Sequence, residues 1–340
     1  MTQASVVRLF LLGLPIGLIV GGIASFGIWF HLRGKAERYD TILATMLRQP
    51  VNQQSLERHV RVLADTIGER HMGIYENLTA AANYIDSSMG PLNMGYDVGY
   101  QTYQVAGKEV ANLEVTLRGT SRPGEIIVVG AHYDTVPGSP GANDNGTGVA
   151  ALLALAHALA GDPQARTIRF VAFVNEEAPF FRTDHMGSYV YARAAHRRGD
   201  NIAAMIALET MGYFTDEPGS QRLPEGIPDG LYPDQGNFIA FVGNEASAAA
   251  MGQARAAFQG ASPVPVEMLA APEPLLDVAG MSDHWSFWQF DYPAFMITDT
   301  APFRYPHYHL PTDTPDRIDF ETFTEVVKGV EAALREIANP

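Results

Sequence analysis

The sequence predicts an α/β fold: a mostly parallel central sheet with helices on both faces, preceded by one N-terminal transmembrane helix. Three observations carry this prediction. Several short runs are apolar at every position, as expected for strands that helices cover on both sides. Segments with helical spacing of apolar residues separate these runs. The uncharged apolar run from Leu9 to Phe30 would span about 33 Å as a helix, enough to cross a bilayer core of about 30 Å.

The first segment predicts an uncleaved membrane anchor. The run is longer than a signal-peptide core, and no clear small-residue cleavage site follows it. The predicted organisation is an anchor at 1–33, a juxtamembrane linker at 34–53 and one large domain at 54–340. Small residues recur every four positions in the anchor and share one face; they are Gly13, Gly17, Gly21 and Ser25. Such a face would permit a homodimer, although glycine is common in membrane helices generally.

The side of the membrane is a separate question. Arg8 precedes the span, whereas Arg33, Lys35 and Arg38 follow it, so charge counting alone would keep the large domain in the cytoplasm. Long domains translocate largely regardless of charge, and the difference is small. We take a single-pass membrane protein with an extracytoplasmic large domain as the expectation.

The sequence of the large domain predicts alternating helices and strands. Helical spacing is found at Gln54–Ile67, Ile74–Met89, Val149–Ala160, Gly187–Arg197, Glu245–Phe258 and Asp283–Gln289. Alternating or wholly apolar strands are expected at Tyr96–Val105, Val110–Leu117, Ile126–Gly130, Ile168–Val174, Ala203–Leu208, Phe238–Val242 and Ala294–Thr298. A final helix carries an apolar stripe from Phe320 to Ile337, with Asp319 placed to cap it. The proline-rich segments Phe214–Gly236 and Ser262–Met281 are expected to be functional loops.

Composition excludes several classes of function. The formal net charge of the 340 residues is −15, so nucleic acid is not an expected partner, because phosphate binding needs a basic face. The chain has no cysteine. Disulfides, thiolate zinc sites and a cysteine nucleophile are therefore excluded.

Potential metal ligands follow the predicted strands. His132 and Asp134 come after Ile126–Gly130, and residues two apart in an extended segment point to the same side. Asp134 could therefore hydrogen-bond one ring nitrogen of His132 while the other nitrogen binds a metal. Asp144 lies in a loop of small residues, and a carboxylate with two oxygens can bridge two metals. An ordinary Asn-Gly turn before a helix explains that loop equally well.

Two adjacent carboxylates end the next buried run. Glu176 and Glu177 leave the strand in different directions, so one can bind a metal while the other acts as a general base. Two solvated acids in a loop are the commoner use of such a pair. Glu209 ends another apolar run, although a lone acid in that position is often a helix cap or a surface residue. Near the last run, His307 or His309 could be a ligand, or neither of them. Asp283 begins an aromatic helix, where it could simply be a cap.

The order of these motifs resembles the co-catalytic two-zinc aminopeptidase family, which includes bacterial leucyl aminopeptidases, glutamate carboxypeptidase and the related glutaminyl cyclases. The resemblance covers roughly residues 54–338. It rests on six ordered motifs: HYD, GANDNGTG, NEE, LETMGY, SDHWSF and HLPTDT.

The resemblance implies a two-zinc centre and a peptide substrate. Asp144 would bridge the two ions, Glu177 and His309 would complete one, and His132 and Glu209 the other. Glu176 would be the general base that takes a proton from the attacking water, with Asp134 behind His132. His309 is preferred to His307 because it stands four residues before Asp313.

Two features depart from the family's usual pattern. Aspartate is commoner at the position of Glu209, and the insertion Ala178–His185 should enlarge the wall of the site. Asp283, Tyr305 and Tyr308 are candidate substrate contacts. The expected function is a membrane-anchored zinc exopeptidase, most simply an aminopeptidase. The alternatives are a glutaminyl cyclase-like acyltransferase on the same fold and an inactive membrane-tethered binding domain.

Overall fold

The computed structural model describes residues 44–340. The predicted anchor (1–33) and the first half of the predicted linker (34–43) lie outside the described residues. Within 44–340, none of the helices combines the length and apolar character needed to cross a membrane.

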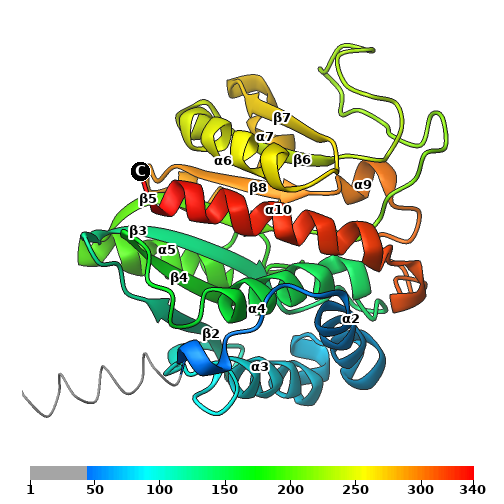
Figure 1. The fold of residues 1–340 in the computed structure, drawn as a ribbon. Coiled ribbons are helices and arrows are strands. Elements are labelled where there is room, and N and C mark those ends of the chain that lie inside the picture. The colour runs from blue at the N-terminus through cyan, green and yellow to red at the C-terminus, as the bar shows by residue number, and fades with distance from the viewer. Residues whose placement is uncertain (1–43) are drawn as a thin grey trace, which may run out of the picture.

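A single eight-stranded sheet forms the centre of the molecule (Figure 1). Its strands are β1 (Gly99–Val105), β2 (Lys108–Leu117), β3 (Arg122–His132), β4 (Arg166–Phe173), β5 (Asn201–Leu208), β6 (Ile239–Asn244), β7 (Val266–Ala271) and β8 (Ala294–Thr298). They lie in the order β1-β2-β4-β3-β5-β8-β6-β7. The central strands β4, β3, β5 and β8 are parallel, as are β6 and β7, whereas the pairs β1–β2, β2–β4 and β6–β8 are antiparallel. The prediction of a mostly parallel α/β sheet is therefore confirmed.

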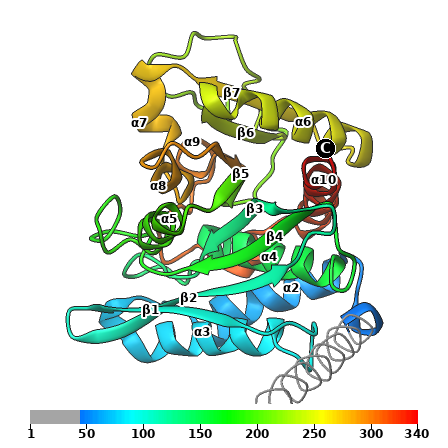
Figure 2. The same ribbon diagram turned by 90° about the vertical axis from the view of Figure 1, so that its left-hand side faces the viewer.

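Helices cover both faces of the sheet (Figure 2). The larger core contains side chains from α2 (Gln53–Arg61), α3 (Tyr75–Met89), α4 (Gly148–Ala158), α6 (Ala248–Ala261) and α10 (Phe320–Ala338). The smaller core contains side chains from α5 (Gly187–Arg198) and α8 (His284–Trp288). Along β3, Ile127 and Val129 enter the larger core, whereas Ile126 and Val128 enter the smaller one. This alternation explains why β3 is apolar at consecutive positions.

The local structure departs from expectation mainly in the proline-rich segments. Phe214–Gly236 contains no helix or strand, as expected. The segment at 262–281, predicted to be a loop, contains β7 and the short helix α7 (Leu276–Ala279). Because β7 is an edge strand paired only with β6, most of its residues stay partly exposed and its apolar signal is weak. Another short helix, α9 (Ala301–Arg304), follows β8.

The cap of the last helix is confirmed. The Asp319 carboxylate accepts a hydrogen bond from the backbone amide of Thr322 at 3.0 Å. The predicted stripe of α10 is buried, including Phe323, Val327 and Leu334. Burying this stripe fixes α10 against α6 and α4 on the larger core.

Candidate metal centre

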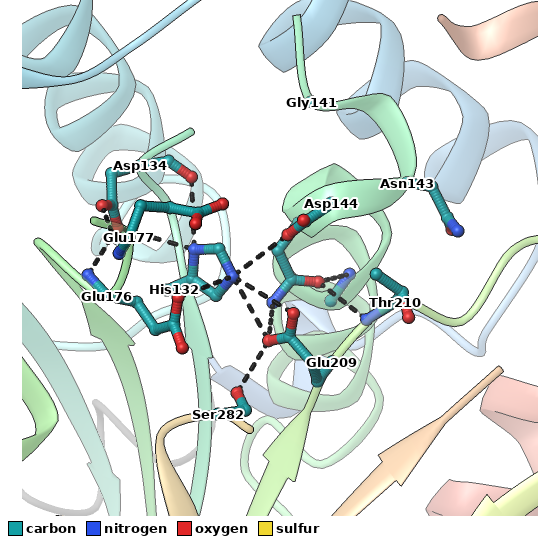
Figure 3. A network of polar contacts seen from close by, with 12 residues as sticks. His132, Asp134, Gly141, Asn143, Asp144, Glu176, Glu177, Glu209, Thr210 and Ser282 are labelled. Atoms are coloured by element: carbon teal, nitrogen blue, oxygen red, sulfur yellow. Dashed lines mark hydrogen bonds and ion pairs between the residues drawn. The ribbon is translucent and has the colours of Figure 1, made fainter. Parts of the chain in front are cut away.

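The carboxyl ends of three parallel strands meet at one edge of the sheet and carry the candidate ligands. His132 is the last residue of β3, Glu176 and Glu177 follow β4, and Glu209 follows β5. All four side chains are buried, with at most 8% of each residue exposed. Asp144, from the loop between β3 and α4, joins them. Figure 3 shows these side chains pointing toward one another.

Asp144 lies between two histidines. Its Oδ1 is 3.3 Å from Nε2 of His132, and its Oδ2 is 3.0 Å from Nε2 of His309. His132 Nε2 is also 3.2 Å from a carboxylate oxygen of Glu209, and His309 Nε2 is 3.4 Å from one of Glu177. Two sets of possible metal ligands result: His132 with Asp144 and Glu209, and His309 with Asp144 and Glu177. A third set, His132 with Glu176 and Glu177, does not include Asp144.

The loop that carries Asp144 is held close to β5. Asn145 donates from its side chain to the carbonyl of Leu208 at 2.8 Å and to Glu209 at 3.2 Å. Gly148, at the start of α4, leaves no room for a side chain, since a Cβ would lie 2.3 Å from the Leu208 carbonyl oxygen. The glycine-rich sequence therefore lets the Asp144 loop approach the end of β5.

Asp134 lies beside His132 and also binds two backbone amides. Its carboxylate accepts hydrogen bonds from the backbone amides of Glu176 and Glu177, each at 3.1 Å. The nearest Asp134 atom to His132 Nδ1 is the backbone carbonyl oxygen at 3.2 Å, with the carboxylate at 3.5 Å. The amides that leave β4 need an acceptor at this buried position, and Asp134 supplies it.

Two hydrogen-bonding residues near the cluster were not assigned a role from the sequence. Ser282 donates its hydroxyl to Glu209 at 2.8 Å, and Asp313 accepts from the backbone amides of Asn143 and Asp144 at 2.8 and 3.1 Å. Asp313 was visible only as part of the HLPTDT motif, because its partner amides lie about 170 residues earlier in the chain. Ser282 stands beside Asp283 in SDHWSF, and nothing local indicates its partner.

The candidate substrate contacts occupy different environments. Asp283 is fully buried, and neither of its carboxylate oxygens has a hydrogen-bond partner. Tyr305 is buried and donates its hydroxyl to Asp313 at 2.8 Å. Tyr308 lines an apolar pocket beside Glu209. His307 turns to Thr312, with 2.9 Å between Nδ1 and the hydroxyl oxygen, so only His309 approaches the carboxylates.

The electrostatics of the cluster favour a bound cation. Burial and the neighbouring Glu177 and Glu209 raise the pKa of Glu176 well above its usual range, although His132 opposes this. Burial, with the nearby Asp144 charge, raises the pKa of Glu177 to about 7. Buried oxygens Asp144 Oδ1 and Glu177 Oε1 have no hydrogen bond. Carboxylate oxygens and imidazole nitrogens are ligands that zinc accepts, and a cation between the acids would relieve their repulsion.

Comparison with known proteins agrees with this geometry. The sequence profile of peptidase family M28 matches residues 112–334. The chain is 38% identical over 289 residues to the uncharacterized protein YfbL of Escherichia coli, covering 83% of this chain and 87% of that protein. It is 30% identical over 215 residues to aminopeptidase YwaD of Bacillus subtilis, covering 62% of this chain and 41% of YwaD.

Solved structures show the same fold. BSAP, a zinc aminopeptidase from Bacillus subtilis, superposes with a TM-score of 0.67 at 17% identity, covering 85% of this chain and 96% of BSAP. A glutaminyl cyclase from Bacteroides thetaiotaomicron superposes with a TM-score of 0.63 at 18% identity, covering 85% and 99% of the two chains. At these identities the likeness concerns the fold alone. The family profile and the converging carboxylates and histidines lead to one conclusion: this chain belongs to peptidase family M28.

Proposed function

We propose that the protein is a two-zinc aminopeptidase whose substrates are peptides with an apolar N-terminal residue. The observation that carries the two-ion proposal is the position of Asp144, which presents one oxygen to each histidine and belongs to both ligand sets. His132 and Glu209 would hold one zinc, Glu177 and His309 the other, and Asp144 would bridge them. Glutamate at position 209 reaches His132 here, and Ser282 and Asn145 orient it.

The residues of the chain divide the proposed reaction among them. When bound, two zinc ions supply Lewis-acid activation of the attacking water and of the peptide carbonyl. Glu176 takes the proton of that water as the general base and then passes it to the leaving amine. Asp134 binds the amides of both Glu176 and Glu177, so it holds the base and a ligand in a fixed relation. The burial of Glu176 excludes bulk water from the proton transfer.

An apolar pocket beside the cluster supports the proposed substrate class. It reaches Glu209 and Tyr308 at one end. Its other walls are mostly apolar and come from the Phe214–Gly236 loop, β6, β7, α7 and β8, with Leu223, Ile227, Phe238, Val242, Met281 and Met296 among them. Ligand pockets are typically apolar with a few polar groups that orient the ligand. An uncharged aliphatic or aromatic side chain would remove this surface from water.

Activity and metal content test the proposal together. Purified full-length protein should bind about two zinc ions and release N-terminal leucine or phenylalanine faster than glycine, aspartate or arginine. Turnover measured as pyroglutamate formation from N-terminal glutamine would instead support a glutaminyl cyclase. Zinc binding without either activity would support a binding domain. A protein that binds no zinc under conditions where it is folded would contradict the proposed centre.

We also propose that residues 1–33 anchor the enzyme as a single-pass membrane protein with its catalytic domain on the extracytoplasmic side. The uncharged run Leu9–Phe30 supports the anchor. Residues 34–340 alone should be soluble, bind zinc and keep full activity, because every proposed ligand lies beyond the anchor. A soluble truncation that regains lost activity only when fused to a dimeriser would favour a dimer through the glycine face instead. Protease accessibility in sealed vesicles tests the sidedness.

A further inference from the structure

A buried arginine lies behind the proposed metal centre. Arg70, in the segment between α2 and α3, is completely buried. Its guanidinium donates from Nε to the carbonyl of Tyr133 at 2.7 Å, from Nη1 to that of Pro140 at 2.6 Å, and from Nη2 to that of Gly141 at 2.9 Å. Nη1 also donates to the carbonyls of Leu63 and Gly68, at 3.3 and 3.2 Å.

The partners of Arg70 are unusual for a buried cation. Among the residues from 44 onward, its guanidinium donates only to backbone carbonyls. Burial lowers the pKa of Arg70 to about 10, and the charges of nearby acids oppose this; they are Asp313, Asp134, Asp144 and Glu177. Burying a charge is costly even when acids lie nearby, whereas an apolar side chain of similar volume would avoid that cost. Fold stability alone therefore does not explain an arginine here, and the geometry of its planar fork becomes the relevant property.

The fork joins the two segments that carry the proposed ligands. Tyr133 stands between His132 and Asp134 at the end of β3, and Gly141 opens the loop that leads to Asp144. The backbone of Arg70 makes a second connection to the β3 end. Its amide donates to the Thr135 hydroxyl, and its carbonyl accepts from the Thr135 amide, each at 3.0 Å. Arg70 therefore ties the His132 strand to the Asp144 loop through a single rigid group.

The backbone of the Asp144 loop leaves space for the Arg70 guanidinium at Gly141. Gly141 has a φ of +62°, and a Cβ at this position would lie 2.4 Å from the Asp144 carbonyl oxygen and 3.2 Å from Nη2 of Arg70. A side chain at Gly141 would therefore push the loop away from the guanidinium and from Asp144.

We propose that Arg70 is a positioning residue that sets the separation between His132 and Asp144 and thereby the affinity of the centre for zinc. This inference rests on the proposed two-zinc function. Geometry and charge predict opposite results when Arg70 is removed. A nearby positive charge repels a metal ion, so charge alone would make the loss of Arg70 tighten zinc binding. Loss of the hydrogen bonds that connect the His132 strand to the Asp144 loop would instead weaken zinc binding.

Zinc affinity of the full-length protein distinguishes the two effects. The variants are Arg70→Met, which removes both charge and fork, and Arg70→Lys, which keeps the charge on a group that cannot span both carbonyls. Competition against a chelator should show zinc binding about 10- to 100-fold weaker in both, the range found when the residues that orient metal ligands are changed. The melting temperature of the zinc-free protein reports the purely structural cost.

Arg166→Met is the matched control. Arg166 begins β4 at the opposite end of the sheet, where it donates to the carbonyl of Ile337 and to Glu125, each at 2.7 Å. It should lower the melting temperature and leave zinc affinity unchanged.

Unchanged or tighter zinc binding in folded Arg70→Met would overturn the proposal. So would wild-type affinity in Arg70→Lys, which would assign the effect to charge. If neither Arg70 variant folds while Arg166→Met does, Arg70 serves the fold and the proposal also fails. A wild-type protein without zinc affinity would instead reject the proposed function, so the two failures remain distinguishable.

Discussion

The ligand cluster combines buried ligands at the ends of strands with one partly exposed ligand from a turn. His132, Glu177 and Glu209 stand at the ends of neighbouring strands whose residues fill two cores. His309 comes from the turn after α9, where its side chain is 37% exposed and its φ is +58°. Strand register places the first group, whereas local turn geometry places His309. Ligands of the two kinds should therefore respond differently to substitution.

The buried base after β4 should have the largest effect on turnover. Glu176→Gln keeps the size of the side chain but cannot accept a proton, so kcat should fall by about 100-fold or more. Zinc content should stay at the wild-type level, because Glu176 is not one of the proposed ligands. Steady-state kinetics with metal analysis checks both. Wild-type turnover in this variant would remove Glu176 from the role of base.

Asp144 belongs to both sets of ligands, so its loss should reduce zinc binding at both sites. In Asp144→Ala both zinc ions should be lost, whereas His132→Ala should empty mainly the site shared with Glu209. The reason is that a bridging carboxylate serves two ions and a terminal histidine serves one. Metal analysis after dialysis decides this. Two tightly held ions in Asp144→Ala would contradict the bridge.

The two histidines should differ in the stability of the zinc-free protein. His132→Ala leaves Asp144 and Glu209 buried without their partner, a change that costs about 3–5 kcal/mol for a buried pair. His309→Ala removes a partly exposed partner, for which about 1 kcal/mol or less is expected. Denaturant unfolding in the presence of a chelator measures both values. Equal losses would mean that exposure does not separate the two kinds of ligand.

The pH dependence of the zinc-free protein is a smaller effect of the same cluster. Burial raises the pKa of Glu177 to about 7, and hydrogen bonds to Asp144 and Glu177 raise that of His309 to about 10 despite its burial. A folded-state pKa above the unfolded one means that the folded protein holds more protons, so stability falls as pH rises through that interval. The melting temperature should therefore be lower at pH 9 than at pH 6.

Zinc provides the control for this pH effect. Bound zinc takes the place of those protons, so saturating zinc should stabilise the protein more at pH 9 than at pH 6. A zinc-free protein whose melting temperature rises between these pH values would show that the carboxylates do not dominate the cluster.

Local patterns determine much of what was predicted. The apolar runs before His132, Glu176 and Glu209 are strands because only side chains covered on both faces can be apolar at consecutive positions. The last helix and its Asp319 cap follow from helical periodicity and one hydrogen bond within a turn. The candidate ligands were visible because each follows such a strand or stands in a motif of the family.

Contacts between distant segments could not be predicted in this way. β7 is a strand because it pairs with β6, although its own sequence has only a weak apolar pattern. The Asp134 carboxylate accepts hydrogen bonds from the amides after β4, and the Asp313 carboxylate accepts them from the amides of the Asp144 loop. These buried donors need acceptors, and only the folded chain brings the acceptors near.

The sequence by itself determined the kinds of side chain in the centre and the strands that carry them. Only the tertiary structure decided that Asp144 presents one oxygen to each histidine and that Arg70 lies behind it. The physical reason is that residue type and periodicity are local properties. The separation between His132 and His309, by contrast, depends on how β3, the Asp144 loop and the turn after α9 pack together.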